Sequence, residues 1–270
     1  MKYGMSQEPG NGRGGSLEAL IKVRDLYKIF HIGSNEVFAL NGVSFDIYQG
    51  EFIAIVGTSG SGKSTCLNML AGLEKPSKGA IQIAGARIDR MTEAELVRFR
   101  RMNVGFIFQS YNLLNSMNAL ENVAMPLMFR GLPEAKRMKA ARKYLELMGI
   151  GNQGQHMPNQ MSGGQQQRVG IARALVIEPK IIFADEPTGN LDSHTTEDVL
   201  NLMRRIVTEQ NKTLIMVTHD NHIAGWADRQ LRVVDGRIVE TVYREGSEIE
   251  KRILAENGEL PFTRVDPVTA

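Results

Sequence analysis

A chain of 270 residues with 42% hydrophobic residues is long enough to bury a substantial core, either as one large domain or as a domain with an inserted lobe. Its 32 basic and 30 acidic residues leave a formal net charge of +2, which argues against a general nucleic-acid-binding protein. The single cysteine, Cys66, excludes an internal disulfide and is typical of a reducing compartment.

The sequence contains no segment suited to cross a membrane. No apolar run approaches the roughly 18 residues that a spanning helix needs. The start of the chain is polar and glycine-rich, without the apolar centre of a secretion signal. We therefore expect a soluble, cytoplasmic protein that acts at a membrane only through a partner. Residues 1–17 are predicted to form a flexible tail.

Strand-like runs dominate the first part of the chain. They cover residues 21–23, 43–47, 52–56 and 80–83. The run over 52–56 ends in a glycine-rich turn and leads into a helix predicted over 63–71. A charged helix over 93–101 and a strand over 104–108 follow.

Helices replace strands between about residues 110 and 165, with helices predicted over 120–129 and 134–148. We interpret this stretch as a helical lobe inserted into an α/β core. Helices and strands then alternate up to a hairpin that turns at Asp235-Gly236. The predicted elements there are helices over 165–176, 195–208 and 221–227 and strands over 181–184, 213–217, 231–234 and 238–242. The main domain is predicted to span 18–244, and 245–270 form a charged extension with a short helix over 249–256.

A phosphate-binding loop follows the strand over 52–56. Its sequence, GTSGSGKST, matches G-x-x-x-x-G-K-[ST] in full between a strand and a helix. The glycines let backbone N–H groups point at a phosphate, and the helix N-terminus adds partial positive charge. We expect Lys63 to reach the β- and γ-phosphates of ATP and Ser64 to ligate Mg²⁺. The predicted cradle comprises Gly57, Thr58, Ser59, Gly60, Ser61, Gly62, Lys63, Ser64 and Thr65.

Two acidic residues end the apolar strand over 181–184. Asp185 is predicted to lie at the edge of the sheet beside the phosphate loop and to hold Mg²⁺ through a water. Glu186 is predicted to point to the other side and to accept a proton from the attacking water. Together with the loop, this pair predicts an ATPase.

Cys66 lies in the first turn of the helix that follows the phosphate loop, where a thiolate would be favoured. Two interpretations stay open. The cysteine is a small buried side chain that fills space, which we favour, or a reactive thiol that reports nucleotide occupancy.

Four further motifs narrow the class of ATPase. Residues 161–168 read MSGGQQQR, and residues 184–192 read ADEPTGNLD. Gln109 closes the apolar run GFIFQ, and His219 follows another in MVTHD. The order and spacing of these motifs resemble the ABC transporter ATPase family over about residues 21–242. Within that family the chain is most similar to the lipoprotein-releasing and macrolide-exporter ATPases.

The resemblance implies a fold and a dimer. The fold is an α/β protein with a RecA-like P-loop ATPase core, an antiparallel β subdomain and an inserted α-helical subdomain. Within the motif over 161–168, Ser162, Gly163 and Gly164, followed by Gln165, are expected to form a second small anion nest at the start of a helix. In the family this nest closes over the ATP of a second protomer, so two ATP molecules lie in a head-to-tail dimer.

The resemblance also implies roles for single residues. Gln109 is expected to bind Mg²⁺ or the attacking water and to relay nucleotide state to the helical lobe. His219 is expected to contact the γ-phosphate and hold the water and Glu186 in line, and Asp192 to lie across the dimer interface. Phe30 occupies the place of the aromatic residue that stacks on adenine, with Tyr27 as the competing candidate.

The helical lobe is rich in methionine and leucine. We expect most of these side chains to form the core of the lobe and a few to line a groove for a short cytoplasmic helix of a membrane subunit. The residues in question are Leu113, Leu114, Met117, Leu120, Met125, Leu127 and Met128.

The leading functional hypothesis is an ATP-driven motor on the cytoplasmic face of the inner membrane. Its expected partners are a second copy of itself, transmembrane permease subunits and, through them, a periplasmic adaptor, but no nucleic acid. The resemblance suggests export or mechanical transmission acting on lipoproteins, peptides or hydrophobic drugs. Soluble ABC ATPases acting on DNA or ribosomes generally fuse two cassettes or carry zinc modules or long coiled coils, which this sequence lacks. An ATPase that regulates a cell-wall hydrolase through a membrane partner stays open as the alternative.

Overall fold

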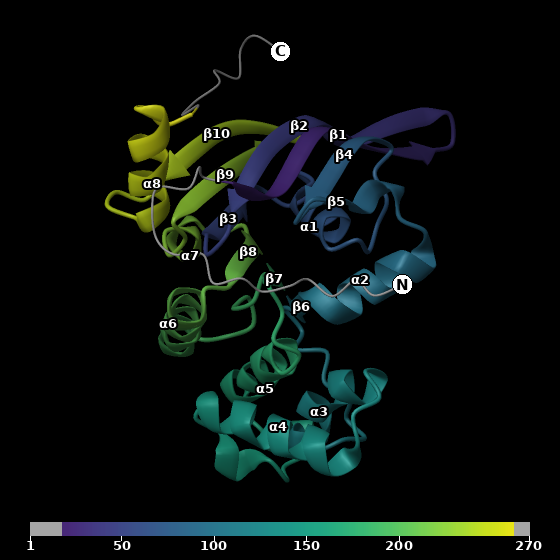
Figure 1. Ribbon diagram of the computed structural model, residues 1–270, viewed down its shortest axis with the longest axis vertical. Coiled ribbons are helices and arrows are strands. Elements are labelled where there is room, and N and C mark those ends of the chain that lie inside the picture. The colour runs from purple at the N-terminus through teal and green to yellow at the C-terminus, as the bar shows by residue number, and fades with distance from the viewer. Residues whose placement is uncertain (1–17, 262–270) are drawn as a thin grey trace.

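The computed structural model describes residues 18–261, so the predicted tail over 1–17 and the last nine residues of the extension lie outside the described part. Within it the strands form two sheets (Figure 1). The larger has the order β10-β9-β3-β8-β7-β6 and is parallel except for the pair β9–β10. Its strands are β3 (Phe52–Val56), β6 (Val104–Ile107), β7 (Ile181–Asp185), β8 (Thr213–Thr218), β9 (Arg229–Val234) and β10 (Arg237–Tyr243).

The central strands of the larger sheet are buried on both faces, which explains their continuous apolar sequences. All five residues of β3 are buried. Alternate residues of β3 pack into different cores, since Phe52 and Ala54 belong to the core shared with the helical lobe and Ile53 and Ile55 to the core under the second sheet. The larger sheet therefore lies between two hydrophobic layers.

The second sheet has the order β2-β1-β4-β5 and is antiparallel. Its strands are β1 (Ala19–Ile32), β2 (Asn35–Tyr48), β4 (Lys78–Ile83) and β5 (Ala86–Arg87). The first two are far longer than the short runs predicted over 21–23 and 43–47. They form a hairpin in which Phe30 pairs with Val37, close to the turn. The sequence underestimates them because the tip of the hairpin is exposed and mixes apolar and polar residues.

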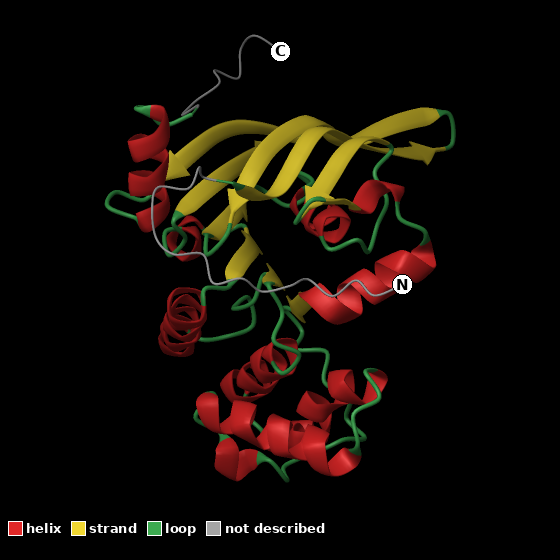
Figure 2. Ribbon diagram, viewed as in Figure 1, coloured by secondary structure: helices red, strands yellow, loops and turns green. Residues whose placement is uncertain are grey.

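Helices make up the lower end of the molecule (Figure 2). In this lobe α3 and α4 pack against each other and against α5, around a core that includes Leu120 and Leu127. Leu114 and Met128 are instead exposed. The α-helices of the described chain are α1 (Lys63–Leu70), α2 (Glu93–Asn103), α3 (Ala119–Phe129), α4 (Glu134–Leu147), α5 (Gly163–Leu175), α6 (Ser193–Gln210), α7 (Asn221–Ala224) and α8 (Glu248–Asn257), and short 3-10 helices cover Ile88–Arg90, Gly151–Gln153 and Pro158–Gln160.

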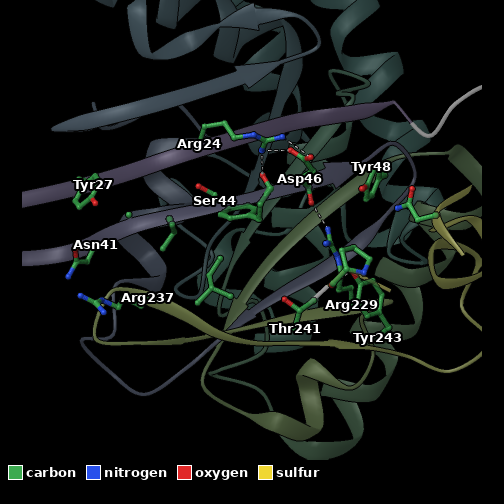
Figure 3. A pocket seen from close by; sticks show the side chains of 16 residues that line it. Arg24, Tyr27, Asn41, Ser44, Asp46, Tyr48, Arg229, Arg237, Thr241 and Tyr243 are labelled. Carbon is green, nitrogen blue, oxygen red and sulfur yellow. Dashed lines mark hydrogen bonds and ion pairs between the residues drawn. The ribbon is translucent and has the colours of Figure 1, made fainter. Parts of the chain in front are cut away.

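A buried ion pair lies where the two sheets meet. Arg229, at the start of β9, donates to the carboxylate of Glu51 at 2.7 Å, and both side chains are almost completely buried. The same guanidinium donates to the backbone carbonyl of Asp46 on β2 and lies between the rings of Tyr48 and Tyr243 (Figure 3). These contacts fix the second sheet against the edge of the first. Arg229, Tyr48 and Tyr243 also line a groove of about 850 Å³ with both polar and apolar walls on the outer surface.

The fold class expected from the sequence is confirmed: an α/β ATPase core with an antiparallel β layer and an inserted helical lobe. None of the described helices is both long and apolar enough to cross a membrane.

Candidate functional site

The phosphate-binding loop connects β3 to α1, and packing requires glycine at two of its positions. A Cβ atom on Gly57 would lie 2.2 Å from the carbonyl oxygen of Val233. Gly62, directly before α1, has φ of 102° and would place a Cβ atom 2.1 Å from the carbonyl oxygen of Ala39. Both clashes are with backbone atoms that a side chain cannot displace, so the loop depends on glycine there.

The loop encloses a cavity suited to an anion. The cavity measures about 580 Å³ and is lined by Ala39, most of the loop, Glu186 and His219. Lys63 is buried, donates to the carbonyl of Thr58 at 2.7 Å, and has its pKa lowered by burial against the opposing effect of nearby carboxylates. The buried hydroxyl of Ser61 has no hydrogen-bond partner. A cradle of backbone N–H groups with a buried ammonium fits the phosphates of a nucleotide.

Asp185 and Ser64 meet at the side of this cavity. The Ser64 hydroxyl donates to Oδ1 of Asp185 at 3.3 Å. Burial raises the pKa of Asp185, while the Ser64 hydrogen bond opposes the shift. The described residues include no cluster of three or more His, Cys, Asp or Glu side chains for a metal. A hydroxyl and one carboxylate beside a triphosphate pocket nevertheless fit Mg²⁺, which usually takes few protein ligands and shares phosphate oxygens.

Glu186 and His219 face each other at the mouth of the cavity. Nδ1 of His219 lies 2.9 Å from Oε1 of Glu186. Nδ1 must carry the hydrogen in this contact when the carboxylate is ionised. Glu186 has φ of 44°, a left-handed conformation that costs energy for residues other than glycine. Its backbone N–H donates to the carbonyl of Val217, which fixes the residue next to the end of β8.

Gln109 lies two residues beyond the end of β6, rather than at the end of the strand as the sequence suggested. A Cβ atom on Gly189 would lie 2.7 Å from its Nε2, so the Gln109 side chain packs directly on the loop after Glu186. The side chain of Asn190 donates to the Gln109 carbonyl at 3.0 Å. These contacts bring the two loops together.

The motif at Ser162 begins α5 as a helix cap. The Ser162 hydroxyl accepts from the N–H of Gln165, and the Gln165 side chain accepts from the N–H of Ser162. Gly163 and Gly164 are the first helical residues, two positions earlier than predicted. A side chain on Gly164 would lie 2.5 Å from Thr195, so close packing as well as the proposed anion nest requires small residues there.

Asp192 also caps a helix. Its carboxylate accepts from the N–H and the hydroxyl of Thr195 at the start of α6. This capping role was not predicted from the sequence. The backbone N–H bond to Thr195 lowers the pKa of Asp192, so the carboxylate stays charged near neutral pH.

The two candidates for adenine stacking lie in different surroundings. Phe30 is 40% exposed, with the ammonium of Lys28 5.2 Å from its ring centroid. Tyr27 lies over Gly42 and lines the outer groove of Figure 3, away from the phosphate loop. Neither ring lines the phosphate cavity itself. The geometry therefore favours Phe30 as the residue free to meet a base.

The reactive-thiol interpretation of Cys66 is wrong. The side chain is buried in the core under the second sheet, and burial raises its pKa to about 12. The helix N-terminus does not offset this desolvation. Cys66 is therefore a buried packing residue.

An apolar groove separates α2 and β6 from α3. It measures about 520 Å³, and Phe129 on its rim is 62% exposed. Of the seven methionines and leucines noted in the lobe, of which a few were expected to line a groove, only Met125 lines this one. The other main apolar lining residues are Val97, Phe106, Phe108, Pro126 and Phe129.

Known proteins resemble this chain over most of its length. The sequence pattern of the ABC transporter family matches residues 40–189. An uncharacterised ABC transporter ATP-binding protein of Thermotoga maritima is 46% identical over 230 residues, which cover 85% of this chain and 97% of that protein. The macrolide export ATP-binding/permease protein MacB of Aggregatibacter actinomycetemcomitans is 43% identical over 246 residues. These cover 91% of this chain but only 38% of MacB.

A solved structure shares both fold and sequence with the chain. It is the dimeric ATP-binding cassette MJ0796 in a post-hydrolysis state, bound to ADP and Pi. It matches with a TM-score of 0.78 and 39% identity, covering 84% of this chain and 100% of that one.

Proposed function

The chain belongs to the ABC transporter family of ATPases, and from that premise we propose that it powers export or mechanical transmission across the inner membrane. The observation that carries the proposed mechanism is the contact between Glu186 and His219 at the mouth of the phosphate cavity. A carboxylate held there by an imidazole can accept a proton from a water that attacks the γ-phosphate.

The position of each residue around the phosphate cavity suggests its role in ATP hydrolysis. Backbone N–H groups of the loop and Lys63 bind the phosphates. Ser64 and, through a water, Asp185 would hold Mg²⁺, which when bound would neutralise charge on the triphosphate. Glu186 takes the proton, while His219 orients its carboxylate. Gln109 lies close enough to the loop after Glu186 to respond to the occupant of the site.

Completion of the site requires a second copy of the chain. The Ser162 nest and Asp192 both serve as helix caps within one copy, and neither lines its phosphate cavity. The related cassette MJ0796 is described as a dimer. We propose that the nest of one copy closes over the ATP of the other in a head-to-tail dimer, which hydrolysis resets.

The apolar groove provides a surface for the membrane partner. Its exposed Phe129 and the adaptable Met125 suit a short amphipathic helix. The MacB relatives are named as ATP-binding/permease proteins, which supports a permease as the functional partner of this ATPase. We propose that such a helix occupies the groove on the cytoplasmic side of the membrane.

Regulation of a cell-wall hydrolase without transport is the alternative function. The ATPase chain would be nearly the same in both functions, so only the identity of the membrane partner distinguishes them. Recovery of a permease with a large periplasmic domain and a pump adaptor supports export. Recovery of a membrane protein that activates a hydrolase supports the alternative.

The mechanism is tested with the variant Glu186→Gln, which keeps the shape of the side chain but removes the proton acceptor. We expect hydrolysis to fall by about 10²- to 10⁴-fold and the variant to become a dimer only with Mg-ATP, measured as mass in solution. Glu209→Gln, in an exposed ion pair on α6, serves as the control and should behave like the unaltered chain.

Two outcomes would contradict parts of this mechanism. Hydrolysis at the unaltered rate in Glu186→Gln would show that Glu186 is not the base. A variant that binds ATP but stays monomeric would show that closure requires the membrane partner or the C-terminal extension.

A further inference from the structure

The loop that carries Gln109 has an unusual backbone. Tyr111 and Asn112, two and three residues further on, have φ of 59° and 50°. A left-handed conformation is rare for a bulky residue such as tyrosine, and two in succession persist only where surrounding contacts hold them. The contacts that hold Tyr111 and Asn112 therefore also affect the position of the loop that carries Gln109.

Arg173 on α5 supplies them. Its Nη1 donates to the carbonyl of Asn112 at 2.5 Å and its Nη2 to the carbonyl of Tyr111 at 2.6 Å. The residue is only 8% exposed. Among the described residues no carboxylate forms an ion pair with it, and burial lowers its pKa. A guanidinium buried without a counter-ion is costly unless carbonyl oxygens satisfy its N–H groups. The guanidinium of Arg173 is therefore stabilised by its hydrogen bonds to the loop.

The clamped loop contacts the loop after Glu186 through two further hydrogen bonds. The Tyr111 hydroxyl donates to the carbonyl of Asn190, and the Asn190 side chain donates to the carbonyl of Gln109. Gln109 itself packs on Gly189, three residues after Glu186. Arg173 can therefore influence the proposed magnesium and water position without touching it.

The clamp also faces the apolar groove. Arg173 and Asn112 both line it, beside Phe108 and Phe129. A helix seated in the groove would contact the clamp directly. The contact between Arg173 and Asn112 therefore links the groove to the loop that carries Gln109.

We propose that Arg173 is a positioning residue: it holds the loop over 109–112 so that Gln109 faces the nucleotide site, and it links that loop to the occupant of the groove. The inference rests on the proposed role of Gln109 in ATP hydrolysis. It predicts that loss of the clamp weakens magnesium-dependent catalysis while nucleotide binding to the phosphate loop persists.

The test compares Arg173→Gln with Arg173→Lys and a matched control, Arg130→Gln. Arg130 also donates to backbone carbonyls, those of Arg101 and Ile177, but does not contact the 109–112 loop. Hydrogen exchange of residues 109–113 and the magnesium dependence of ATP hydrolysis are measured on the full chain. Binding of a fluorescent ATP analogue without magnesium reports the phosphate loop separately.

Arg173→Gln should speed exchange over 109–113 selectively. It should also lower hydrolysis or raise the magnesium concentration for half-activity by about 10- to 100-fold, the range for residues that orient a metal site from behind. The dissociation constant of the ATP analogue should change by no more than about twofold. That is well below the tenfold change to which about 1.4 kcal/mol corresponds. Arg173→Lys keeps the charge but cannot span both carbonyls, so it should recover part of the loss. Arg130→Gln should leave the magnesium dependence unchanged.

Unaltered hydrolysis and magnesium dependence in Arg173→Gln, despite faster exchange, would overturn the proposal and leave Arg173 a structural residue. Equal effects in Arg130→Gln would overturn it as well. If Arg173→Gln does not fold, Arg173→Lys carries the same test. An unaltered chain without magnesium-dependent hydrolysis would refute the proposed function instead, and the exchange data would still report the clamp.

Discussion

Single residues of the sequence motifs also stabilise the fold of the isolated chain. Ser162 and Asp192 cap α5 and α6, although the resemblance assigns both to contacts across a dimer. Helix caps contribute about 0.5–2 kcal/mol, so a loss of activity on substitution can have two causes. The motif residues themselves could be predicted from the sequence, because their spacing fixes their chemistry. Arg173 and Asn190 could not be assigned roles, since their partners lie 61 and 81 residues away.

The buried thiol gives a prediction at the residue scale. With a pKa of about 12, Cys66 is ionised in only about one molecule in 10⁴ at pH 8, compared with about a quarter for an ordinary thiol. We expect thiol reagents to label the folded protein at least about 10³-fold more slowly than the unfolded protein in denaturant. Labelling of the folded chain at the unfolded rate would show that Cys66 is accessible. A rate that depended on ATP would restore the reporter interpretation.

The helix α5 connects three parts of the candidate site. Ser162 begins it, Gln167 donates to the carbonyl of Pro187 beside Glu186, and Arg173 clamps the loop after Gln109. Gln167, Gly170 and Arg173 follow each other at intervals of three and so lie along one side of the helix. The periodicity of the sequence predicts the helix, whereas these contacts depend on loops placed by the tertiary fold.

Gly170 offers a prediction at the scale of this element. A Cβ atom there would lie 3.7 Å from the carbonyl oxygen of Tyr111 and 3.9 Å from Oε1 of Gln167, both ordinary contacts. Gly170→Ala should therefore raise the free energy of unfolding by about 0.5–1 kcal/mol through helix propensity, measured by chemical denaturation. Gly105→Ala is the contrasting variant, because its Cβ atom would lie 2.6 Å from the carbonyl of Ala174, and it should destabilise the protein. A loss of stability in Gly170→Ala would show that α5 tolerates no added volume there.

The sequence predicts the sheets and the helical lobe of the molecule, but not the contacts of Arg229 that hold the two sheets together. Local patterns identify strands, helices and the inserted lobe, because burial on one or two faces leaves a periodic sequence. The ion pair of Glu51 and Arg229 joins residues 178 positions apart. No local pattern distinguishes such a pair from the many charged residues on the surface. The long hairpin was underestimated for a related reason, since its exposed tip lacks a periodic apolar face.

Removal of the Glu51 carboxylate should destabilise the contact between the two sheets. Glu51→Gln would leave the Arg229 guanidinium buried without its counter-ion, and breaking a buried pair typically costs about 3–5 kcal/mol. The exposed pair of Arg24 and Asp46 is the comparison, since Asp46→Asn should cost about 0–1 kcal/mol. Both are measured as free energies of unfolding by denaturant.

The double variant Glu51→Leu with Arg229→Met should recover part of the loss, because apolar side chains remove the uncompensated charge. It should not recover all of it, since the backbone N–H of Tyr48 and carbonyl of Asp46 would lose their partners. A cost below 1 kcal/mol for Glu51→Gln would mean that water or Tyr243 compensates the guanidinium. The two sheets would then be held together mainly by the apolar core between them.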